Sequence, residues 1–103
     1  MPSRLPRDAR FRPKPRVLVR QVDAEAVLLD LETARYFSLN ATGRRVWELL
    51  SAGAPVAATL EALAAEFDAP PAELEADVAA LVEELESSGL LLRDGPEGSE
   101  GLP

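Results

Sequence analysis

The sequence contains no cysteine and no histidine. Without cysteine, the chain can form no disulfide, thiol nucleophile or thiolate metal site. The absence of histidine removes both the commonest general base and the commonest metal ligand. A glycine-rich phosphate loop is also missing, and carboxylate pairs such as Glu73 with Asp77 lie on the polar side of a predicted helix, which is typical of a solvated face. The composition therefore argues against an enzyme, a metal site and a bound cofactor.

Long apolar runs are absent as well. No segment approaches the roughly 18–20 apolar residues of a membrane span. The basic N-terminus is not followed by the apolar stretch of a secretory signal. We therefore expect a cytoplasmic protein with no membrane partner. With 103 residues and 47% hydrophobic content, the chain predicts one folded domain with a modest core.

The net charge of −7 is unevenly distributed along the chain. Residues 1–20 hold seven basic groups and one acidic group, a net of +6, whereas the rest hold four basic and seventeen acidic groups, a net of −13. Such an acidic body repels nucleic acid, so only the N-terminal segment could attract it. That segment could equally lie on its own acidic domain or touch an acidic partner.

The composition divides the chain into three parts. Residues 1–15 contain four prolines and scattered arginines without an apolar period, which predicts a flexible basic arm, either solvated or in contact with a partner. Residues 16–92 carry the periodic patterns of a folded domain. Residues 93–103, rich in glycine and acid, predict a flexible tail.

Short β-branched and alternating segments predict three antiparallel strands at the start of the domain, at residues 16–22, 26–31 and 35–39. In the last of these, Tyr36 and Ser38 share one face, and Arg35, Phe37 and Leu39 share the other. Because this strand ends the meander, we expect its outer edge to be open, with unpaired N–H and C=O groups.

Helical periodicity begins after Asn40, which predicts an N-cap. The first helix would end before Gly53, and its predicted buried stripe is Gly43, Val46, Trp47 and Leu50. A second helix follows from about Pro55 to Phe67, with a stripe of Val56, Leu60, Leu63 and Phe67.

The third predicted helix is the longest and runs from Pro71 to about Ser88, where Gly89 stops it. Its apolar stripe is Leu74, Val78, Leu81 and Leu85, widened at the margin by Val82. Residues 90–92 predict a brief strand or apolar strap.

Three strands followed by three helices predict an α+β fold of the winged helix-turn-helix type. In that topology the last helix of the turn motif would read DNA. Here it carries six carboxylates and no lysine or arginine, which would weaken binding to phosphate. A DNA-binding regulator is therefore an alternative, and we expect no nucleic-acid partner.

A peptide-binding module agrees better with these patterns. An extended peptide can add as a strand to the open edge at residues 35–39, and a helix beside that edge would complete a groove. Apolar pockets would come from Val78, Leu81, Val82 and Leu85. The competing interpretation is that these side chains fill the core. It is favoured for Leu74 and Leu81 in the middle of the stripe, whereas Asp77 and Val82 at its margins are better groove candidates.

The run LLDLETARYFSLNATGRRVWELL, followed by DVAALVEELESSGLL, resembles the PqqD-like family of RiPP recognition elements over about residues 17–92. RiPPs are ribosomally synthesised and post-translationally modified peptides. The resemblance implies a small, non-catalytic winged-helix domain that binds the leader of a precursor peptide. It also implies delivery to a modifying enzyme, which would be a protease, a cyclase or a radical-SAM protein. The hydrophobic second strand followed by RYFSLN looks nearer to lasso-pathway and generic members than to the pyrroloquinoline quinone protein.

In the family, the leader pairs with the third strand and packs against the third helix. Carried over to this sequence, the resemblance implies a peptide-binding site made of Ala34, Arg35, Tyr36, Phe37, Ser38, Asp77, Val78, Leu81, Val82 and Leu85. Where this chain has Ala34, the family often has a glycine, which permits a positive φ, so we expect a different turn type here.

Two further expectations concern partners. The acidic third helix favours a leader that carries basic residues. The edge-rich fold predicts a monomer or a strand-exchanged homodimer. A winged-helix interaction domain that contacts an enzyme without a leader is the remaining alternative.

Overall fold

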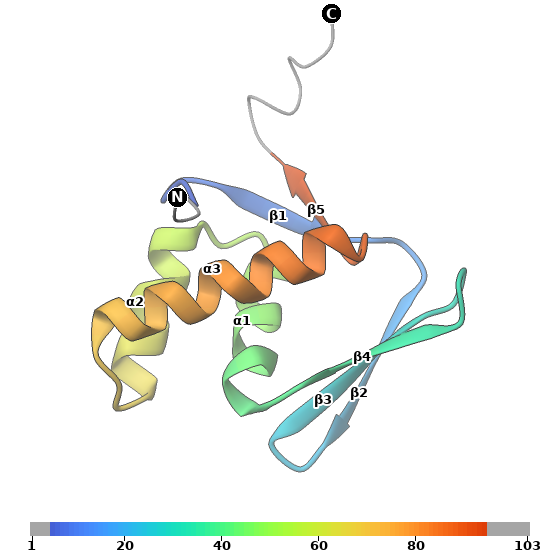
Figure 1. The fold of residues 1–103 in the computed structure, drawn as a ribbon, viewed down its shortest axis with the longest axis horizontal. Coiled ribbons are helices and arrows are strands. Elements are labelled where there is room, and N and C mark those ends of the chain that lie inside the picture. The colour runs from blue at the N-terminus through green and yellow to red at the C-terminus, as the bar shows by residue number, and fades with distance from the viewer. Residues whose placement is uncertain (1–4, 95–103) are drawn as a thin grey trace, which may run out of the picture.

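The structure, a computed structural model, describes residues 5–94. Two small antiparallel sheets and three helices surround a single core (Figure 1). The elements in chain order are β1 (Arg10–Pro13), β2 (Val17–Val22), β3 (Glu25–Asp30), β4 (Arg35–Leu39), α1 (Ala41–Ser51), α2 (Val56–Glu66), α3 (Pro71–Ser87) and β5 (Leu91–Asp94). The predicted α+β order of a three-stranded antiparallel sheet followed by three helices is confirmed. The winged helix-turn-helix description stays a prediction.

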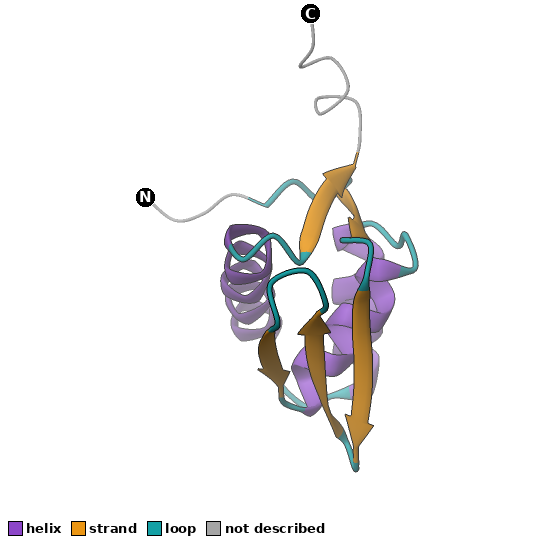
Figure 2. Cartoon of the chain, turned by 90° about the vertical axis from the view of Figure 1, so that its right-hand side faces the viewer, coloured by secondary structure: helices purple, strands orange, loops and turns teal. Residues whose placement is uncertain are grey.

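The larger sheet has the strand order β2-β3-β4, with β3 in the middle. Register pairs Val19 with Leu28 and Leu28 with Phe37, so these side chains share one face. That face lies towards the helices, and Leu28 is fully buried there. The opposite face is uncovered, as Figure 2 shows with the helices behind the strands, and Tyr36 on it is 73% exposed.

Helix α1 occupies the centre of the fold and contacts both sheets and both other helices (Figure 1). The predicted N-cap is confirmed, because the Asn40 side chain accepts a hydrogen bond from the Gly43 N–H at 2.8 Å. The predicted buried stripe of this helix is confirmed in full. A Cβ at Gly43 would lie 3.2 Å from Asn40 Oδ1 and 3.3 Å from Leu39, so glycine lets α1 begin close to β4.

The predicted ends of α1 and α3 are also confirmed. Gly53 and Gly89 follow these helices with φ values of 97° and 76°, the left-handed conformation that ends a helix. Helix α2 buries Val56 and Leu63 of its predicted stripe, while Leu60 and Phe67 are partly buried.

Arg10–Pro13 form β1, although the sequence predicts a flexible arm over these residues. This strand pairs with β5, so Arg93 and Asp94, which are expected to belong to the flexible tail, are part of a strand. Phe11 is only 2% exposed and supplies an apolar anchor that the charged residues around it concealed in the sequence. Leu91 and Leu92 of the predicted brief strand lie in β5, which continues to Asp94. Residues 1–4 of the expected arm and residues 95–103 of the expected tail lie outside the described residues.

The buried carboxylate of Asp30 joins the two sheets. It is 3% exposed and accepts hydrogen bonds from Lys14 Nζ at 2.7 Å and from the Glu32 and Thr33 N–H groups at 2.9 and 3.4 Å. The Lys14 ammonium, and then the two backbone N–H groups, lower the pKa of Asp30 against the opposing effect of burial. The carboxylate of Asp30, then that of Glu32, raises the pKa of Lys14.

The turn between β3 and β4 depends on the same residue. Ala34 donates its N–H to the Asp30 carbonyl at 2.8 Å and has a φ of 63°. The expectation of another turn type is therefore wrong, because the alanine itself adopts the conformation that glycine would favour. A left-handed alanine costs about 1 kcal/mol, and the hydrogen bonds to Asp30 hold the backbone in this conformation.

We predict that Asp30→Asn removes an acid-sensitive part of the stability. Because the pKa of Asp30 is lower in the folded than in the unfolded chain, its contribution is present above about pH 4 and is lost as pH falls. The urea midpoint of the wild type should exceed that of the variant at pH 7, and this difference should shrink towards pH 3. Fluorescence of Trp47, the single tryptophan, reports the transition. A difference that is constant from pH 7 to pH 3 would contradict this role.

Candidate functional site

A groove of about 450 Å³ separates β4 from α3. The wall on β4 consists of Phe37, Ser38 and Leu39, and the wall on α3 consists of Asp77, Val78, Ala80, Leu81 and Glu84. Residues at the start and on one side of α1 line the groove between these walls, namely Asn40, Thr42, Gly43 and Val46. Helix α1 therefore sets the distance between strand and helix.

A smaller hollow of about 140 Å³ continues the groove towards the start of β4, and Phe37 lines both spaces. Its other lining residues include Arg35 and Tyr36 at the start of β4, and Ser88 just after α3. The start of β4 therefore lies near the end of α3, and the two elements run in opposite directions. Five strand residues extend roughly 17 Å, and residues 77–88 of the helix side extend about the same length.

The outer edge of β4 is open along this groove. Within residues 5–94, β4 pairs with β3 alone, and no other strand lies on its far side. The predicted edge position of this strand is confirmed. An open edge presents a row of backbone donors and acceptors that an extended chain can pair with.

The structure brings most of the predicted site residues to this groove. Phe37, Ser38, Asp77, Val78 and Leu81 line its main part. Arg35 and Tyr36 line the smaller hollow, and Ala34 forms the turn just before them.

Two of the predicted site residues belong to the core instead. Val82 is 1% exposed and Leu85 is fully buried, and neither lines the groove. The buried stripe of α3 is Leu74, Val78, Val82 and Leu85. The prediction that Val82 is a groove residue is therefore wrong, and Leu81, predicted to be core, packs against the core but also lines the groove. Both side chains fit a helical stripe, and the packing of α1 against α3 decides which one is covered.

The sequence reasoning missed several lining residues, namely Leu39, Asn40, Thr42, Gly43, Val46, Ala80 and Glu84. Those of α1 gave no signal, because a residue at the start of a helix can line a groove only after the third helix is placed. Glu84 could have been found, since it lies seven residues after Asp77 and therefore on the same side of the helix.

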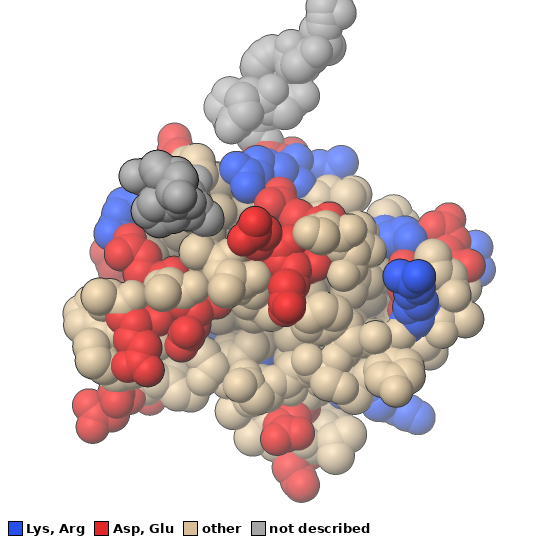
Figure 3. Space-filling view, viewed as in Figure 1, with Lys and Arg blue, Asp and Glu red and all other residues tan. Residues whose placement is uncertain are grey.

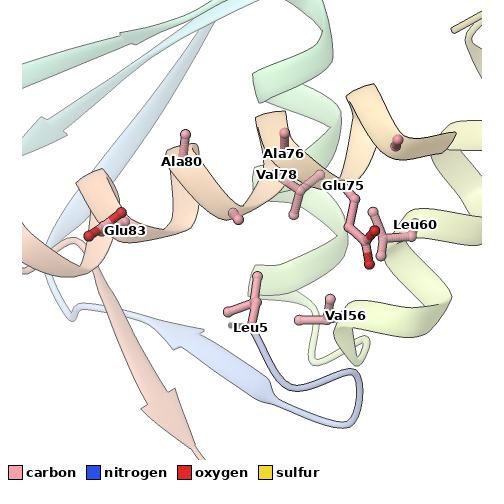
Figure 4. A pocket seen from close by; sticks show the side chains of 10 residues that line it. Leu5, Val56, Leu60, Glu75, Ala76, Val78, Ala80 and Glu83 are labelled. Atoms are coloured by element: carbon pink, nitrogen blue, oxygen red, sulfur yellow. The ribbon is translucent and has the colours of Figure 1, made fainter. Parts of the chain in front are cut away.

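A second groove of about 470 Å³ lies on the other side of α3 (Figure 4). It is bounded by α2, by the segment around Leu5 and by the alanine-rich side of α3. Arg7 and Glu75 form an ion pair of 3.0 Å beside it. No strand residue lines this second groove, so it offers a peptide no backbone edge to pair with.

Charged groups are unevenly distributed over the face of the molecule that Figure 3 draws. Figure 3 shows carboxylates gathered over α2 and α3, with basic groups towards the sheet and towards the β1–β5 pair. Among the described residues, no group of carboxylates is arranged to hold a metal ion. Nor is any helix of this part of the chain long and apolar enough to cross a membrane.

Comparison with known proteins identifies relatives of this fold. The family model for coenzyme PQQ synthesis protein D (PqqD) matches residues 25–91. The structure of a lasso peptide synthetase B1 complexed with the leader peptide superposes with a TM-score of 0.73 and 34% identity, covering 82% of this chain and 99% of that one. TbiB1 in complex with the TbiA(beta) leader peptide gives 0.71 and 32%, covering 78% of this chain and 93% of that one. No curated protein matches the sequence.

We predict that truncating the two neighbouring side chains of α3 lowers the stability by different amounts. Val82→Ala leaves a cavity in the core and should lower the free energy of unfolding by roughly 2 kcal/mol. Leu81→Ala removes a partly buried groove side chain and should cost about 1 kcal/mol or less. Urea denaturation followed by Trp47 fluorescence measures both. A larger loss for Leu81→Ala would show that the assignment of core and groove is inverted.

Proposed function

The chain belongs to the PqqD family, and we propose that it is a non-catalytic recognition element that binds the leader of a ribosomally made precursor peptide. The leader adds to β4 as a further strand and packs its side chains against α3. The bound precursor is then presented to a separate modifying enzyme, a protease, cyclase or radical-SAM protein.

The observation that carries this proposal is the open edge of β4 beside the groove that separates it from α3. Backbone groups on one wall and the partly buried side chain of Leu81 on the other suit an extended peptide. The two similar structures support it, since each is a complex with a leader peptide and each is more than 30% identical to this chain. One of them is a lasso peptide synthetase B1, so a lasso-peptide pathway is the first to test.

The expected affinity is moderate. Each backbone hydrogen bond contributes about 0.5–1.5 kcal/mol, and each buried apolar anchor contributes about 1.5–3 kcal/mol. Ordering an extended peptide on the edge costs several kcal/mol in return. The balance corresponds to a Kd near micromolar. That affinity suffices because the recognition element acts by raising the effective concentration of the substrate at the enzyme.

The uncovered face of the sheet is the proposed contact with the modifying enzyme. In the described part of the chain, all large hydrophobic side chains that are exposed lie on or next to β2, β3 and β4, namely Leu18, Val19, Val22, Leu31 and Tyr36. Leu18, Val22 and Tyr36 share the uncovered face, whereas Val19 lies on the other face with Leu28. A shallow apolar hollow on this face includes Leu18, Leu29 and Arg20 among its lining residues. No carboxylate of the described residues pairs with Arg20.

These features favour an enzyme surface with an apolar centre and carboxylates at its rim. A second copy placed face to face about a twofold axis would bring the Arg20 side chains of both copies onto the same interface. Like charges at an interface disfavour that arrangement.

We predict that Leu81→Asp and Leu18→Asp separate the two binding steps. A carboxylate at position 81 replaces an apolar side chain of the leader groove and should weaken leader binding by about tenfold or more. A carboxylate at position 18 lies on the opposite face, so it should leave leader binding unchanged and reduce association with the enzyme.

The measurement uses labelled peptides from the small reading frames beside the gene, titrated by fluorescence anisotropy, with labelled duplex DNA at about physiological salt as the negative control. The neighbouring modifying enzymes are tested by pull-down with the purified proteins. Both variants must melt cooperatively. If no such peptide binds the wild type, or if duplex DNA binds instead, the proposed function is wrong.

A further inference from the structure

Two carboxylates on the α3 wall of the groove have no cationic partner in the described part of the chain. Asp77 and Glu84 both line the groove and are exposed. The ion pairs of the structure involve other carboxylates, and the groove lining contains no lysine or arginine. The groove is therefore negatively charged at two points on one wall.

An apolar side chain lies between these two charges. Leu81 follows Asp77 by four residues and precedes Glu84 by three, and all three line the groove. Along the helix axis, Leu81 is about 6 Å and Glu84 about 10 Å beyond Asp77, at 1.5 Å per residue. The wall thus presents acid, leucine and acid in that order.

A strand added to β4 matches this order in its own side-chain period. Alternate residues of a strand point to the same face, and each such step extends about 6.7 Å. The first, third and fifth of five residues facing α3 therefore lie at about 0, 7 and 13 Å. The third meets Leu81, and the outer two lie within reach of Asp77 and Glu84, because lysine and arginine side chains are long and flexible.

We propose that the groove selects a five-residue leader segment with basic residues at its first and fifth positions and an apolar residue at its third position. The apolar side chain packs on Leu81, and the basic side chains pair with Asp77 and Glu84. This inference rests on the proposed leader binding and adds the residues that determine its specificity. Because the pattern is symmetric, it applies to a leader that runs in either direction along β4.

Helix α3 itself supplies the matched control. Glu83 is adjacent to Glu84 and exposed like it, but it lines the second groove on the other side of the helix (Figure 4). Glu73 is exposed in the first turn and lines neither groove. The double variants Asp77→Asn/Glu84→Gln and Glu73→Gln/Glu83→Gln change the net charge equally, so any difference between them reports position and not total charge.

The experiment compares three synthetic versions of the leader that binds in the preceding test. The five leader residues that pair with β4 are replaced by Lys-Thr-Leu-Thr-Lys, by Gln-Thr-Leu-Thr-Gln or by Glu-Thr-Leu-Thr-Glu. Exposed ion pairs contribute about two- to fivefold each, so the wild type should bind the lysine peptide about four- to twenty-five-fold more tightly than the glutamine peptide. The glutamate peptide should bind most weakly. Raising KCl from 50 to 500 mM should reduce the preference.

The expected result is loss of this preference in Asp77→Asn/Glu84→Gln and its retention in Glu73→Gln/Glu83→Gln. Leader binding without any preference for lysine over glutamine would overturn this inference and leave the proposed function standing. Equal loss of preference in both double variants would also overturn it, since net charge would then be the cause. Failure of every leader to bind would overturn the proposed function as well.

Discussion

The buried carboxylate of Asp30 is the interaction on which the arrangement of the strands depends. It ends β3, holds the backbone of the turn before β4 and pairs with Lys14, which lies between β1 and β2. One side chain therefore ties the smaller sheet to the larger sheet and determines where β4 begins. The left-handed backbone of Ala34 is held by the same residue. Because β4 supplies the open edge, a buried carboxylate at the end of β3 positions the exposed backbone of β4.

Helix α1 is the second structural requirement for the groove. Asn40 starts it immediately after β4, and Gly43 allows its first turn to lie against Leu39. The helix then lies between β4 and α3 and keeps them apart, with Val46 lining the space. The result is a site made of backbone groups, apolar side chains and the carboxylates of Asp77 and Glu84, which suits the binding of an extended peptide. In the proposed function, the leader binds at the edge of β4 beside α3, and the enzyme binds the uncovered face of the sheet. The enzyme can therefore approach while the leader is bound.

The two grooves beside α3 show why a hollow alone does not define a function. They have similar volumes and share the residues Val78 and Ala80. One is bounded by an open strand edge and the other by a helix and the N-terminal segment. Only the first can supply the row of hydrogen bonds that an extended chain requires. The carboxylates of α3 are likewise divided between the two sides, and this division gives Asp77 and Glu84 a different environment from Glu83.

Local chemistry in the sequence was enough to determine the number, type and order of the main elements. Asn40, Gly53 and Gly89 mark helix ends through hydrogen bonding and backbone conformation within a few residues. The edge position of β4 follows from its place at the end of the meander. Tertiary packing decided the rest. The pairing of β1 with β5 joins segments about eighty residues apart, which no local pattern reveals. The choice between Leu81 and Val82 as the groove residue depends on the rotation of α3 against α1, because both lie within one apolar band.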